Sequence, residues 1–523
     1  MSACVESAVM SLKKLVAGVV LLGWVSGCTQ PFSPRPVETD TSAGLVSALR
    51  ADVGYLASEE LEGRGVGTDG LRAAGDFIAR RFEQIGLQPM PGFEGYFHNF
   101  EMTIGSRIGE QSRLAAEDRA LKLDEDWRPL AWSASGAVTG EVVFAGYAIN
   151  APQQAYNDFA DVDVTGKIVV AMRYEPHDAE GNSRWGGASN TRHATLLQKA
   201  RAAHEAGASA LILVNPPTHR GPVSDQLLPF SGGGARSPIP VLTITRAVLD
   251  AWLRDAGKQD IAALQRQIDE QVKPQSFVID GVSIMGEVDV QPRREMVRNV
   301  IGVWPGQGPR AGEFVVVGAH YDHLGRGGAG SLAPDSTAIH HGADDNASGT
   351  AALLHVAERI ARTGPRERSI LFIAFTAEER GLIGSARFVD DERAPVDRIV
   401  AMINLDMVGR VRNDMLYVGG GGTAAGFESV LKEIDSASPL QLKSMGRGGR
   451  GPSDHASFSR KQIPVLFLFS GLHEDYHRPT DTADKINYEG LADVVSVTSK
   501  LVERIAAMPR EQYVDRYDAE GTD

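Results

Sequence analysis

The chain has 523 residues, of which 42% are apolar, so it can bury a large core and is long enough for two or more domains. Its formal net charge of −14 at pH 7 excludes nucleic acid as the main partner, because phosphate binding requires a basic surface.

Residues 1–28 have the pattern of a bacterial lipoprotein signal peptide. Lys13 and Lys14 precede an apolar stretch that is too short to cross a membrane. The stretch ends in VSGC, which resembles a lipobox with Cys28 as the lipidated residue. An ordinary signal peptide with an incidental cysteine is the alternative, and Met10 is a second candidate start.

Cys4 and Cys28 are the two cysteines of the chain, so we expect the mature protein to have no disulfide and no thiolate metal ligand. Residues 29–42 are rich in Pro, Ser and Thr and predict a flexible tether. The pattern, with Thr29 after the cysteine, predicts a lipid-anchored protein of the cell envelope. We expect it at the outer membrane, facing the periplasm or the cell surface.

Two helices are predicted next. Residues 45–61 are helix-like, and residues 63–70 read as a loop. Residues 71–85 form an amphipathic pattern of helical period, which Gly86 should end. We assign residues 43–135 to the first part of a large host domain.

Residues 136–272 have a different pattern. EVVFAGYA and GKIVVAMRY read as strands, LLQKARAAHEAGASALILVNP as a helix and a buried strand, and IPVLTITRAVLDAWL as a strand and a helix. This block contains no cluster of potential metal ligands. Its strand order and its Ala-rich helix resemble a mainly-β protease-associated (PA) domain inserted into a host enzyme.

From residue 299 onward, continuous apolar runs alternate with helical patterns. This alternation predicts an α/β fold, a mostly parallel mixed sheet covered by helices on both faces. In such sheets, binding sites form at the carboxyl ends of the strands. We assign residues 273–510 to the second part of the host domain and residues 511–523 to a C-terminal tail.

Polar residues follow several of these apolar runs. His320 and Asp322, then Glu378 and Glu379, then Asp406 each follow an expected strand, while GADDNASG precedes a helix and DYHRPTD follows the last strand. Each residue alone is explained by hydrogen bonding at a strand end. Five loops that bring imidazole and carboxylate to one edge instead indicate a two-metal site, and zinc is the expected metal, with Co²⁺ or Mn²⁺ as substitutes.

The motifs GAHYDHLG, GADDNASGTAALL, FTAEERGLIGS, INLDMVG, SDHASF and YHRPTDTADKI resemble those of the co-catalytic zinc peptidases of metallopeptidase family 28, clan MH, in order and spacing. The resemblance covers nearly the whole mature chain. It implies the zinc exopeptidase fold, which is phosphorylase/hydrolase-like, with the PA domain inserted.

The resemblance also implies a ligand set of five residues. His320 and Asp406 match the ligands of one zinc ion, and Glu379 and His477 match the ligands of the other. Asp345 matches the carboxylate that bridges the two ions.

Other residues around these ligands match supporting roles. Asp322 matches the acid that orients the His320 imidazole. The family often has a cis peptide bond after the residue that matches Asp345, and Asp344 is the weaker candidate for the bridge. Glu378 matches the general base, which takes a proton from the attacking water and delivers it to the leaving amine. Tyr476 matches a hydrogen-bond donor to the substrate carbonyl in some branches, with simple packing as the alternative.

The remaining candidates have plainer interpretations. We expect His323 to shape its loop. His340 and His341 are expected to be solvated, with lining of the site entrance as the alternative, and His455 and His473 to be structural or to belong to substrate loops. The glycine run at 418–422 lacks the ending of a phosphate loop. Surface positions are expected for Arg447 and Arg450, and contact with a substrate carboxylate is the alternative.

The leading hypothesis is therefore a zinc aminopeptidase acting on peptides. Three alternatives remain open at this point. They are a carboxypeptidase of acidic dipeptides, which needs an arginine cluster that we cannot place, a non-catalytic binding protein on a decayed peptidase fold, and a single-zinc glutaminyl cyclase. The preferred side chain and the oligomeric state are not predicted.

Overall fold

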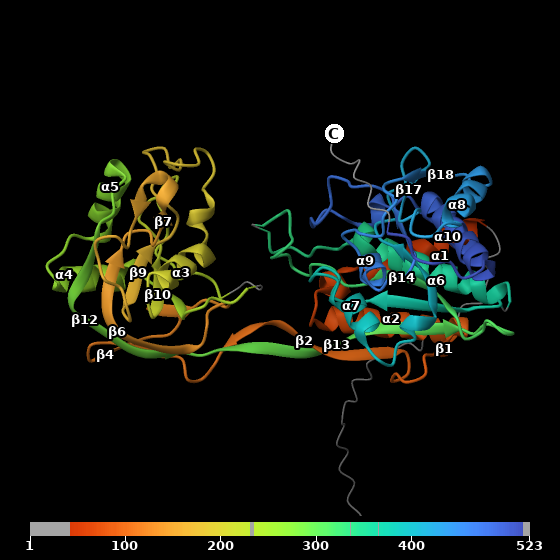
Figure 1. The fold of residues 1–523 in the computed structure, drawn as a ribbon, viewed down its shortest axis with the longest axis horizontal. Coiled ribbons are helices and arrows are strands. Elements are labelled where there is room, and N and C mark those ends of the chain that lie inside the picture. The colour runs from red at the N-terminus through yellow and green to blue at the C-terminus, as the bar shows by residue number, and fades with distance from the viewer. Residues whose placement is uncertain (1–41, 231–234, 335, 365, 516–523) are drawn as a thin grey trace, which may run out of the picture.

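The computed structural model describes residues 42–230, 235–334, 336–364 and 366–515. It consists of two lobes, each built on its own sheet, joined by a long pair of strands (Figure 1). The first lobe contains both ends of the described chain. The second lobe is formed by a continuous central part of the sequence, as expected for an inserted domain.

The first lobe has a nine-stranded sheet that is parallel at its centre and antiparallel at both sides. The four central strands are parallel, and almost every residue in them is buried, which explains their continuous apolar sequence. In sheet order they are β15 (Ser369–Phe375), β14 (Phe314–His320), β16 (Ile399–Leu405) and β19 (Val465–Phe469). The flanking strands are β1 (Gln88–Pro89), β2 (Phe97–Ile108), β13 (Val290–Trp304), β17 (Met415–Gly419) and β18 (Gln441–Ser444).

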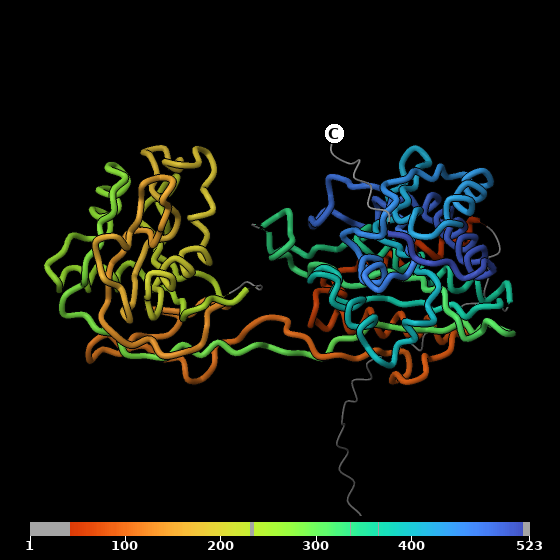
Figure 2. Tube along the Cα trace, in the orientation of Figure 1, coloured from red at the N-terminus to blue at the C-terminus, as the bar shows by residue number. Residues whose placement is uncertain are grey.

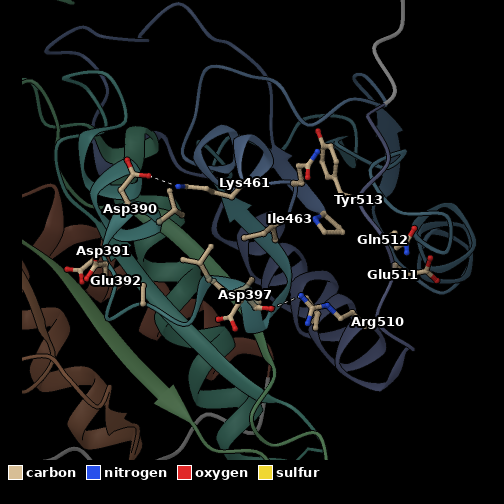
Figure 3. A pocket seen from close by; sticks show the side chains of 17 residues that line it. Asp390, Asp391, Glu392, Asp397, Lys461, Ile463, Arg510, Glu511, Gln512 and Tyr513 are labelled. Carbon is tan, nitrogen blue, oxygen red and sulfur yellow. Dashed lines mark hydrogen bonds and ion pairs between the residues drawn. The ribbon is translucent and has the colours of Figure 1, made fainter.

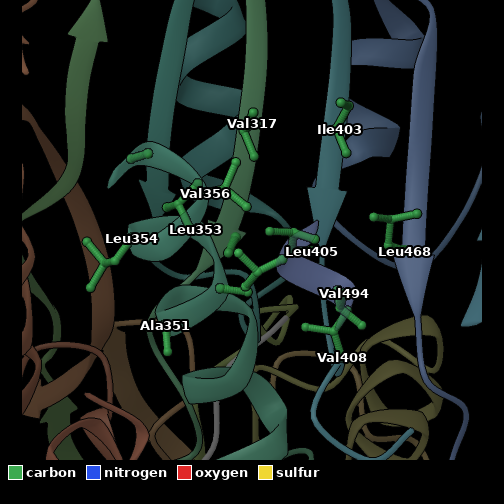
Figure 4. Packing of buried hydrophobic residues seen from close by; sticks show 14 of the residues in the cluster. Val317, Ala351, Leu353, Leu354, Val356, Ile403, Leu405, Val408, Leu468 and Val494 are labelled. Carbon is green, nitrogen blue, oxygen red and sulfur yellow. The ribbon is translucent and has the colours of Figure 1, made fainter. Parts of the chain in front are cut away.

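Helices cover both faces of this sheet, which confirms the predicted α/β architecture. Alternate residues of the same strands enter two separate cores. Phe372 belongs to the core that includes residues of α1, α2, α6, α8 and α10, and Leu371 belongs to the core that includes residues of α7 and α9. Figure 4 shows the first core, where Val317 of β14 lies close to Leu353 and Val356 of α6 and Ile403 lies on the neighbouring strand. The helices are α1 (Ser42–Leu56), α2 (Asp69–Ile85), α6 (Gly349–Arg362), α7 (Ile383–Asp390), α8 (Phe427–Ser436), α9 (His455–Arg460) and α10 (Tyr488–Ala507).

The two helices predicted at the start of this lobe are present. The first, α1, ends at Leu56, and the rest of the predicted span forms a separate 3₁₀ turn over Glu59–Arg64. The second, α2, is capped by the Thr68 hydroxyl, which accepts a hydrogen bond from the Leu71 amide at 3.2 Å. It ends at Gly86, whose φ of 88° is the left-handed conformation expected of a C-terminal glycine.

The second lobe has an eight-stranded sheet with helices packed on both faces. The strands predicted within residues 136–272 are present as β6 (Gly136–Ala145), β9 (Ile168–Met172), β10 (Ala210–Val214) and β11 (Val241–Ile244), which are parallel neighbours in this order. The sheet also includes strands outside that block. They are β3 (Arg113–Ala116), β4 (Arg119–Leu121), β5 (Trp127–Pro129) and β12 (Ser276–Val288). A two-stranded ribbon of β7 (Asn150–Ala151) and β8 (Tyr156–Asn157) and the helices α3 (Leu196–Glu205), α4 (Arg246–Asp255) and α5 (Ile261–Gln271) complete the lobe.

Two antiparallel strands, β2 and β13, connect the lobes. They pair from Val290 opposite Ile108 to Val300 opposite Phe97, so the chain leaves and re-enters the first lobe along one ribbon. Figure 2 shows these two passages, in orange and green, and also a loop after β14 that projects from the first lobe towards the second.

The predicted signal peptide, the lipidated cysteine and almost all of the tether lie outside the described residues. Among the helices of the described ranges, none combines the length and apolarity needed to cross a membrane.

Candidate metal centre

The central strands deliver three of the predicted site segments to one edge of the first sheet. His320 is the last residue of β14, Asp406 directly follows β16, and Glu378 and Glu379 follow β15 after a two-residue turn. Because β14, β15 and β16 are parallel, their carboxyl ends meet. The loops before α6 and after β19 add Asp345 and His477 to the same place.

His320 forms one half of the site. Its Nε2 lies 3.2 Å from Asp406 Oδ1 and 3.3 Å from Asp345 Oδ1. Its Nδ1 lies 3.2 Å from the backbone carbonyl of Asp322, which only accepts, so Nδ1 carries the proton and Nε2 is left to face the two carboxylates. This is the arrangement of a histidine that binds a metal through Nε2.

The carboxylate of Asp322 acts on its neighbours instead. Its Oδ1 is 3.9 Å from His320 Nδ1, which is beyond hydrogen-bond distance. It accepts the backbone N–H groups of Glu378 at 3.0 Å and Glu379 at 3.4 Å. Asp322 therefore fixes the turn that carries both glutamates, while its carbonyl orients the imidazole.

His477 and Glu379 form the other half. His477 Nε2 lies 3.1 Å from Asp345 Oδ2 and 3.2 Å from Glu379 Oε2. Its Nδ1 donates to the Gly330 carbonyl at 2.8 Å, so Nε2 again faces the carboxylates. The two oxygens of Asp345 are thus divided, Oδ1 towards His320 and Oδ2 towards His477, as a bridging carboxylate requires.

His323 also belongs to this half, although we expected it only to shape its loop. Its Nδ1 lies 2.7 Å from Glu379 Oε1, and its side chain is fully buried. Glu379 is 56 positions away in the chain, so the contact depends on the pairing of β14 with β15. A second imidazole three residues after His320 was the available signal.

The neighbouring glutamates have opposite electrostatic environments. Burial raises the pKa of Glu378 well above its ordinary range, and the charges of Asp406 and Asp454 add to this effect. Burial and the charge of Asp345 also act to raise the pKa of Glu379, but its hydrogen bonds to His323 and His477 outweigh them and lower it. Within the described ranges the side chain of Glu378 accepts no hydrogen bond, and it is only half-buried. One glutamate is held by imidazoles and the other is free to exchange a proton.

The loop that carries Asp345 is held by hydrogen bonds from backbone amides to buried carboxylates. The Asp345–Asn346 peptide bond is cis, as the family resemblance implies. Asp481 accepts the amides of Asp344 at 2.8 Å and Asp345 at 3.1 Å, and its other oxygen lies 3.0 Å from Arg410. The carboxylate of Asp344 accepts the Gly409 amide at 2.6 Å, so it supports the loop and points away from the bridging position.

Arg64 ties three segments together beneath the site, a role that we did not predict from the sequence. Its guanidinium is fully buried and donates to the carbonyls of Tyr321 at 2.9 Å, His341 at 2.9 Å and Gly342 at 2.8 Å, and also to that of Leu56. Burial lowers its pKa to about 10, against the opposing effect of nearby acids, of which Asp345 is the strongest. The arginine therefore places a buried positive charge close to the carboxylates of the site.

The ring of Tyr476 contacts one of the predicted metal ligands. The ring stacks on His477 with centroids 3.8 Å apart and planes at 22°. Burial, with the charges of Asp345 and Glu379, raises the pKa of its hydroxyl, so the phenol stays protonated and able to donate. Its hydroxyl makes no hydrogen bond to the described residues.

Three residues at the site have left-handed backbones that are unfavourable for side chains other than glycine. They are Ala377 (φ 56°) before Glu378, Met407 (φ 54°) after Asp406, and His477 itself (φ 53°). Each costs about 1–3 kcal/mol, and such residues cluster at functional sites.

The donor chemistry fits two divalent metal ions. Donor atoms of His320, Asp345 and Asp406 lie within 4.8 Å of one another, and the same holds for His323, Asp345 and Glu379. Imidazole with carboxylate and no thiolate is the ligand set of catalytic zinc sites. Burial is the main cause of the raised pKa of Glu378, and the charges of Asp406 and Asp454 add to it, so the carboxylates of the site repel one another.

A separate cavity of about 960 Å³ lies between α7 and the C-terminal segment of the described chain. Figure 3 shows Lys461 paired with Asp390 at 2.8 Å and Arg510 donating to the Asp397 carbonyl at 2.7 Å across it. None of its lining residues belongs to the two metal groups.

Two family models match the chain in the regions that form the two lobes. "Peptidase family M28" matches residues 299–502, and "PA domain" matches residues 138–252. The first of these ranges contains every predicted ligand and the predicted base.

Several curated relatives carry aminopeptidase names. The chain is 29% identical over 308 residues to "Aminopeptidase YwaD" of Bacillus subtilis, an alignment that covers 57% of each chain. It is 26% identical over 257 residues to "Leucine aminopeptidase 1" of Arthroderma otae, which covers 45% of this chain and 64% of that protein. The chain thus spans less than two thirds of the length of these relatives.

A solved structure titled as that of BSAP, a zinc aminopeptidase from Bacillus subtilis, has a similar fold. It is 22% identical, with a TM-score of 0.51, and the match covers 90% of this chain and 98% of that one. This likeness supports the architecture of both lobes in one chain. Residues 299–502 are therefore similar to peptidase family M28, and residues 138–252 are similar to the PA domain.

Proposed function

We propose that the protein is a zinc-dependent aminopeptidase that removes N-terminal residues from peptides by means of a two-metal site. The observation that carries this proposal is the divided carboxylate of Asp345, one oxygen 3.3 Å from His320 and the other 3.1 Å from His477. The aminopeptidase names of the relatives support the same reaction.

The five predicted ligands would hold the metals in two groups. His320 and Asp406 belong to one group, Glu379 and His477 to the other, and Asp345 to both. When bound, two zinc ions polarise the scissile carbonyl and lower the pKa of the attacking water.

Glu378 has the features of a general base. It is next to a ligand, it has no hydrogen-bond partner among the described residues, and its environment favours the protonated form. It would accept a proton from the attacking water and pass it to the departing amine. The protonated hydroxyl of Tyr476 would donate to the oxygen of the substrate carbonyl.

The carboxypeptidase alternative gains no support from the two arginines near the C-terminal loops. Arg447 contacts Glu428, and Arg450 lies 3.9 Å from Asp515, so both are close to carboxylates of the chain itself. The binding-protein alternative leaves unexplained why a base such as Glu378 stands beside a complete ligand set. A one-zinc cyclase would not need the Asp345 bridge.

The test is hydrolysis of a panel of aminoacyl p-nitroanilides by the full chain, with and without a chelator, together with zinc analysis. We expect activity on free N-termini, its loss with chelator, its return with Zn²⁺, and about two zinc ions per chain. Activity restricted to N-blocked peptides with free C-termini would refute the aminopeptidase assignment.

We also propose that the protein is a lipoprotein of the cell envelope, anchored through Cys28. The support is the VSGC sequence after a short apolar stretch. Radiolabelled palmitate should be incorporated into the full chain and lost in Cys28→Ser; equal labelling of both proteins would contradict the anchor.

A further inference from the structure

We infer that His323 is a sixth protein ligand of the site and binds the metal held by Glu379 and His477. This inference rests on the proposed two-metal site and adds a residue to it. It gives one metal position four protein ligands and leaves the other with three.

The first argument is convergence. His323 Nδ1 lies 2.7 Å from Glu379 Oε1 and 3.8 Å from Asp345 Oδ2. His477 Nε2 approaches the other Glu379 oxygen and the same Asp345 oxygen, at 3.2 and 3.1 Å. Two imidazole nitrogens from different loops therefore face one pair of carboxylates.

The relation between the two rings agrees with shared coordination. The ring centroids of His323 and His477 are 5.8 Å apart and their planes are at 67°. Two imidazoles bound to one zinc at about 2.0–2.1 Å place their centroids about 5 to 6 Å apart. The rings are thus already at the separation that one ion requires.

The second argument is that His323 does not act as a loop-shaping residue. Its Nε2 is buried and has no partner among the described residues, and Nδ1 contacts only the carboxylates of the site. A histidine that shapes a loop would bond to loop backbone through its ring. Here the loop is held by main-chain bonds instead, from the His323 amide to the Arg64 carbonyl at 3.1 Å and through the Gly65 bridge.

The surroundings keep the ring facing the site. Gly342 has a φ of 56°, and a Cβ at that position would come within 2.5 Å of the His323 ring. Any side chain at 342 would therefore displace the imidazole. The absence of a side chain at Gly342 leaves the space that the His323 ring occupies.

The consequence is an asymmetric metal pair. His323, His477, Glu379 and Asp345 would complete a four-ligand set, as in closed zinc positions. His320, Asp406 and Asp345 supply three ligands, which leaves a position open for water or substrate, as in catalytic zinc sites. Glu378 directly precedes Glu379 in the chain, but its side chain has no hydrogen-bond partner among the described residues. It can therefore act as a base on a water at the open position.

The test compares His323→Asn, His323→Ala and His323→Cys with the wild type, all as full chains. His341→Asn is the matched control, because His341 is in the same region but its Nδ1 bonds to the Ala57 carbonyl at 3.0 Å. Zinc stoichiometry is measured by mass spectrometry after dialysis against buffered Zn²⁺, and affinity by competition with a chromophoric chelator. Circular dichroism establishes that each variant is folded.

We expect the wild type and His341→Asn to hold two zinc ions, and His323→Asn and His323→Ala to lose more than about 100-fold in affinity for one of them, a greater loss than that of a supporting hydrogen bond. In Co²⁺-loaded His323→Cys, a thiolate-to-cobalt charge-transfer band should appear that the wild type lacks. This signal identifies a ligand position independently of activity and stability.

Two results would overturn the inference. One is full zinc affinity in His323→Asn with a loss only in His323→Ala, since asparagine can replace a hydrogen bond to Glu379 but is a poor zinc ligand. The other is a His323→Cys spectrum without the thiolate band. A wild type that binds fewer than two metal ions would instead refute the proposed function, so the two failures are distinguishable.

Discussion

Glu378 and Glu379 are adjacent acids, and replacing each with glutamine should have different effects. Glutamine keeps the shape of the side chain and removes its charge. Glu379 accepts contacts from two imidazoles, at 2.7 and 3.2 Å, whereas Glu378 accepts no hydrogen bond among the described residues. Glu379→Gln should therefore lower metal binding, while Glu378→Gln should leave both metal positions filled.

The magnitude follows from the chemistry assigned to each position. A positioned general base contributes about 10²–10⁴-fold, so Glu378→Gln should lower kcat by that factor, or about 3–5 kcal/mol of barrier. Burial raises the pKa of Glu378, which means that its ionised form is less favourable in the folded protein. At neutral pH, above the ordinary pKa of a glutamate, metal-free Glu378→Gln should resist urea at least as well as the wild type.

The assay measures kcat on leucine p-nitroanilide and zinc per chain on the same samples after gel filtration. The reasoning requires a large loss of kcat in Glu378→Gln with zinc unchanged, and a loss of zinc in Glu379→Gln. Glu378→Gln with full activity would refute the role of the base. Equal zinc content in Glu379→Gln and the wild type would refute its role as a ligand.

Three further predictions concern the surroundings of the site. Tyr476→Phe keeps the stack on His477 and removes the hydroxyl, so kcat should fall about 100-fold with zinc content unchanged; unaltered kcat would show that the residue only packs. Arg64→Met leaves buried carbonyls without a donor and should lower the free energy of unfolding by about 3–5 kcal/mol, measured by urea titration; a change below about 1 kcal/mol would contradict this. Burial lowers the pKa of His455 to about 4, so its contribution to stability is complete above about pH 6.5 and is lost as the pH falls towards 4. His455→Phe, which can still stack on Phe467, should remove about 3 kcal/mol of the destabilisation between pH 7.5 and pH 4, and an unchanged pH dependence would exclude His455 as its source.

The architecture of the first lobe was readable because its central strands are buried on both faces. Every residue of β15 is buried, so its sequence is almost entirely apolar and the apolar run ends where the strand ends. The limits of the second lobe were harder to read. Strands β3 and β12 join its sheet from outside the block that we singled out. In the sheet β12 lies between β3 and β6 and pairs antiparallel with both, and pairing between segments so far apart in the chain is not a local property of the sequence.

Only part of the site could be predicted in the same way. Most of its predicted ligands stand out as polar residues after apolar strands, and all of them lie in segments that resemble the family motifs. His323 also follows β14, but nothing in the sequence favoured a ligand over a structural histidine there, because its partner Glu379 is in another strand-end loop. Arg64 lies far earlier in the chain, and nothing in its local sequence indicates that it holds the loops near residues 321 and 342.

The sequence by itself determined which residue types reach the carboxyl edge of the sheet, since strand length and polarity are local properties. The tertiary structure decided how they are paired. The division of the Asp345 oxygens, the freedom of Glu378 and the position of His323 depend on distances between loops, and those distances follow from the order and register of β14, β15 and β16.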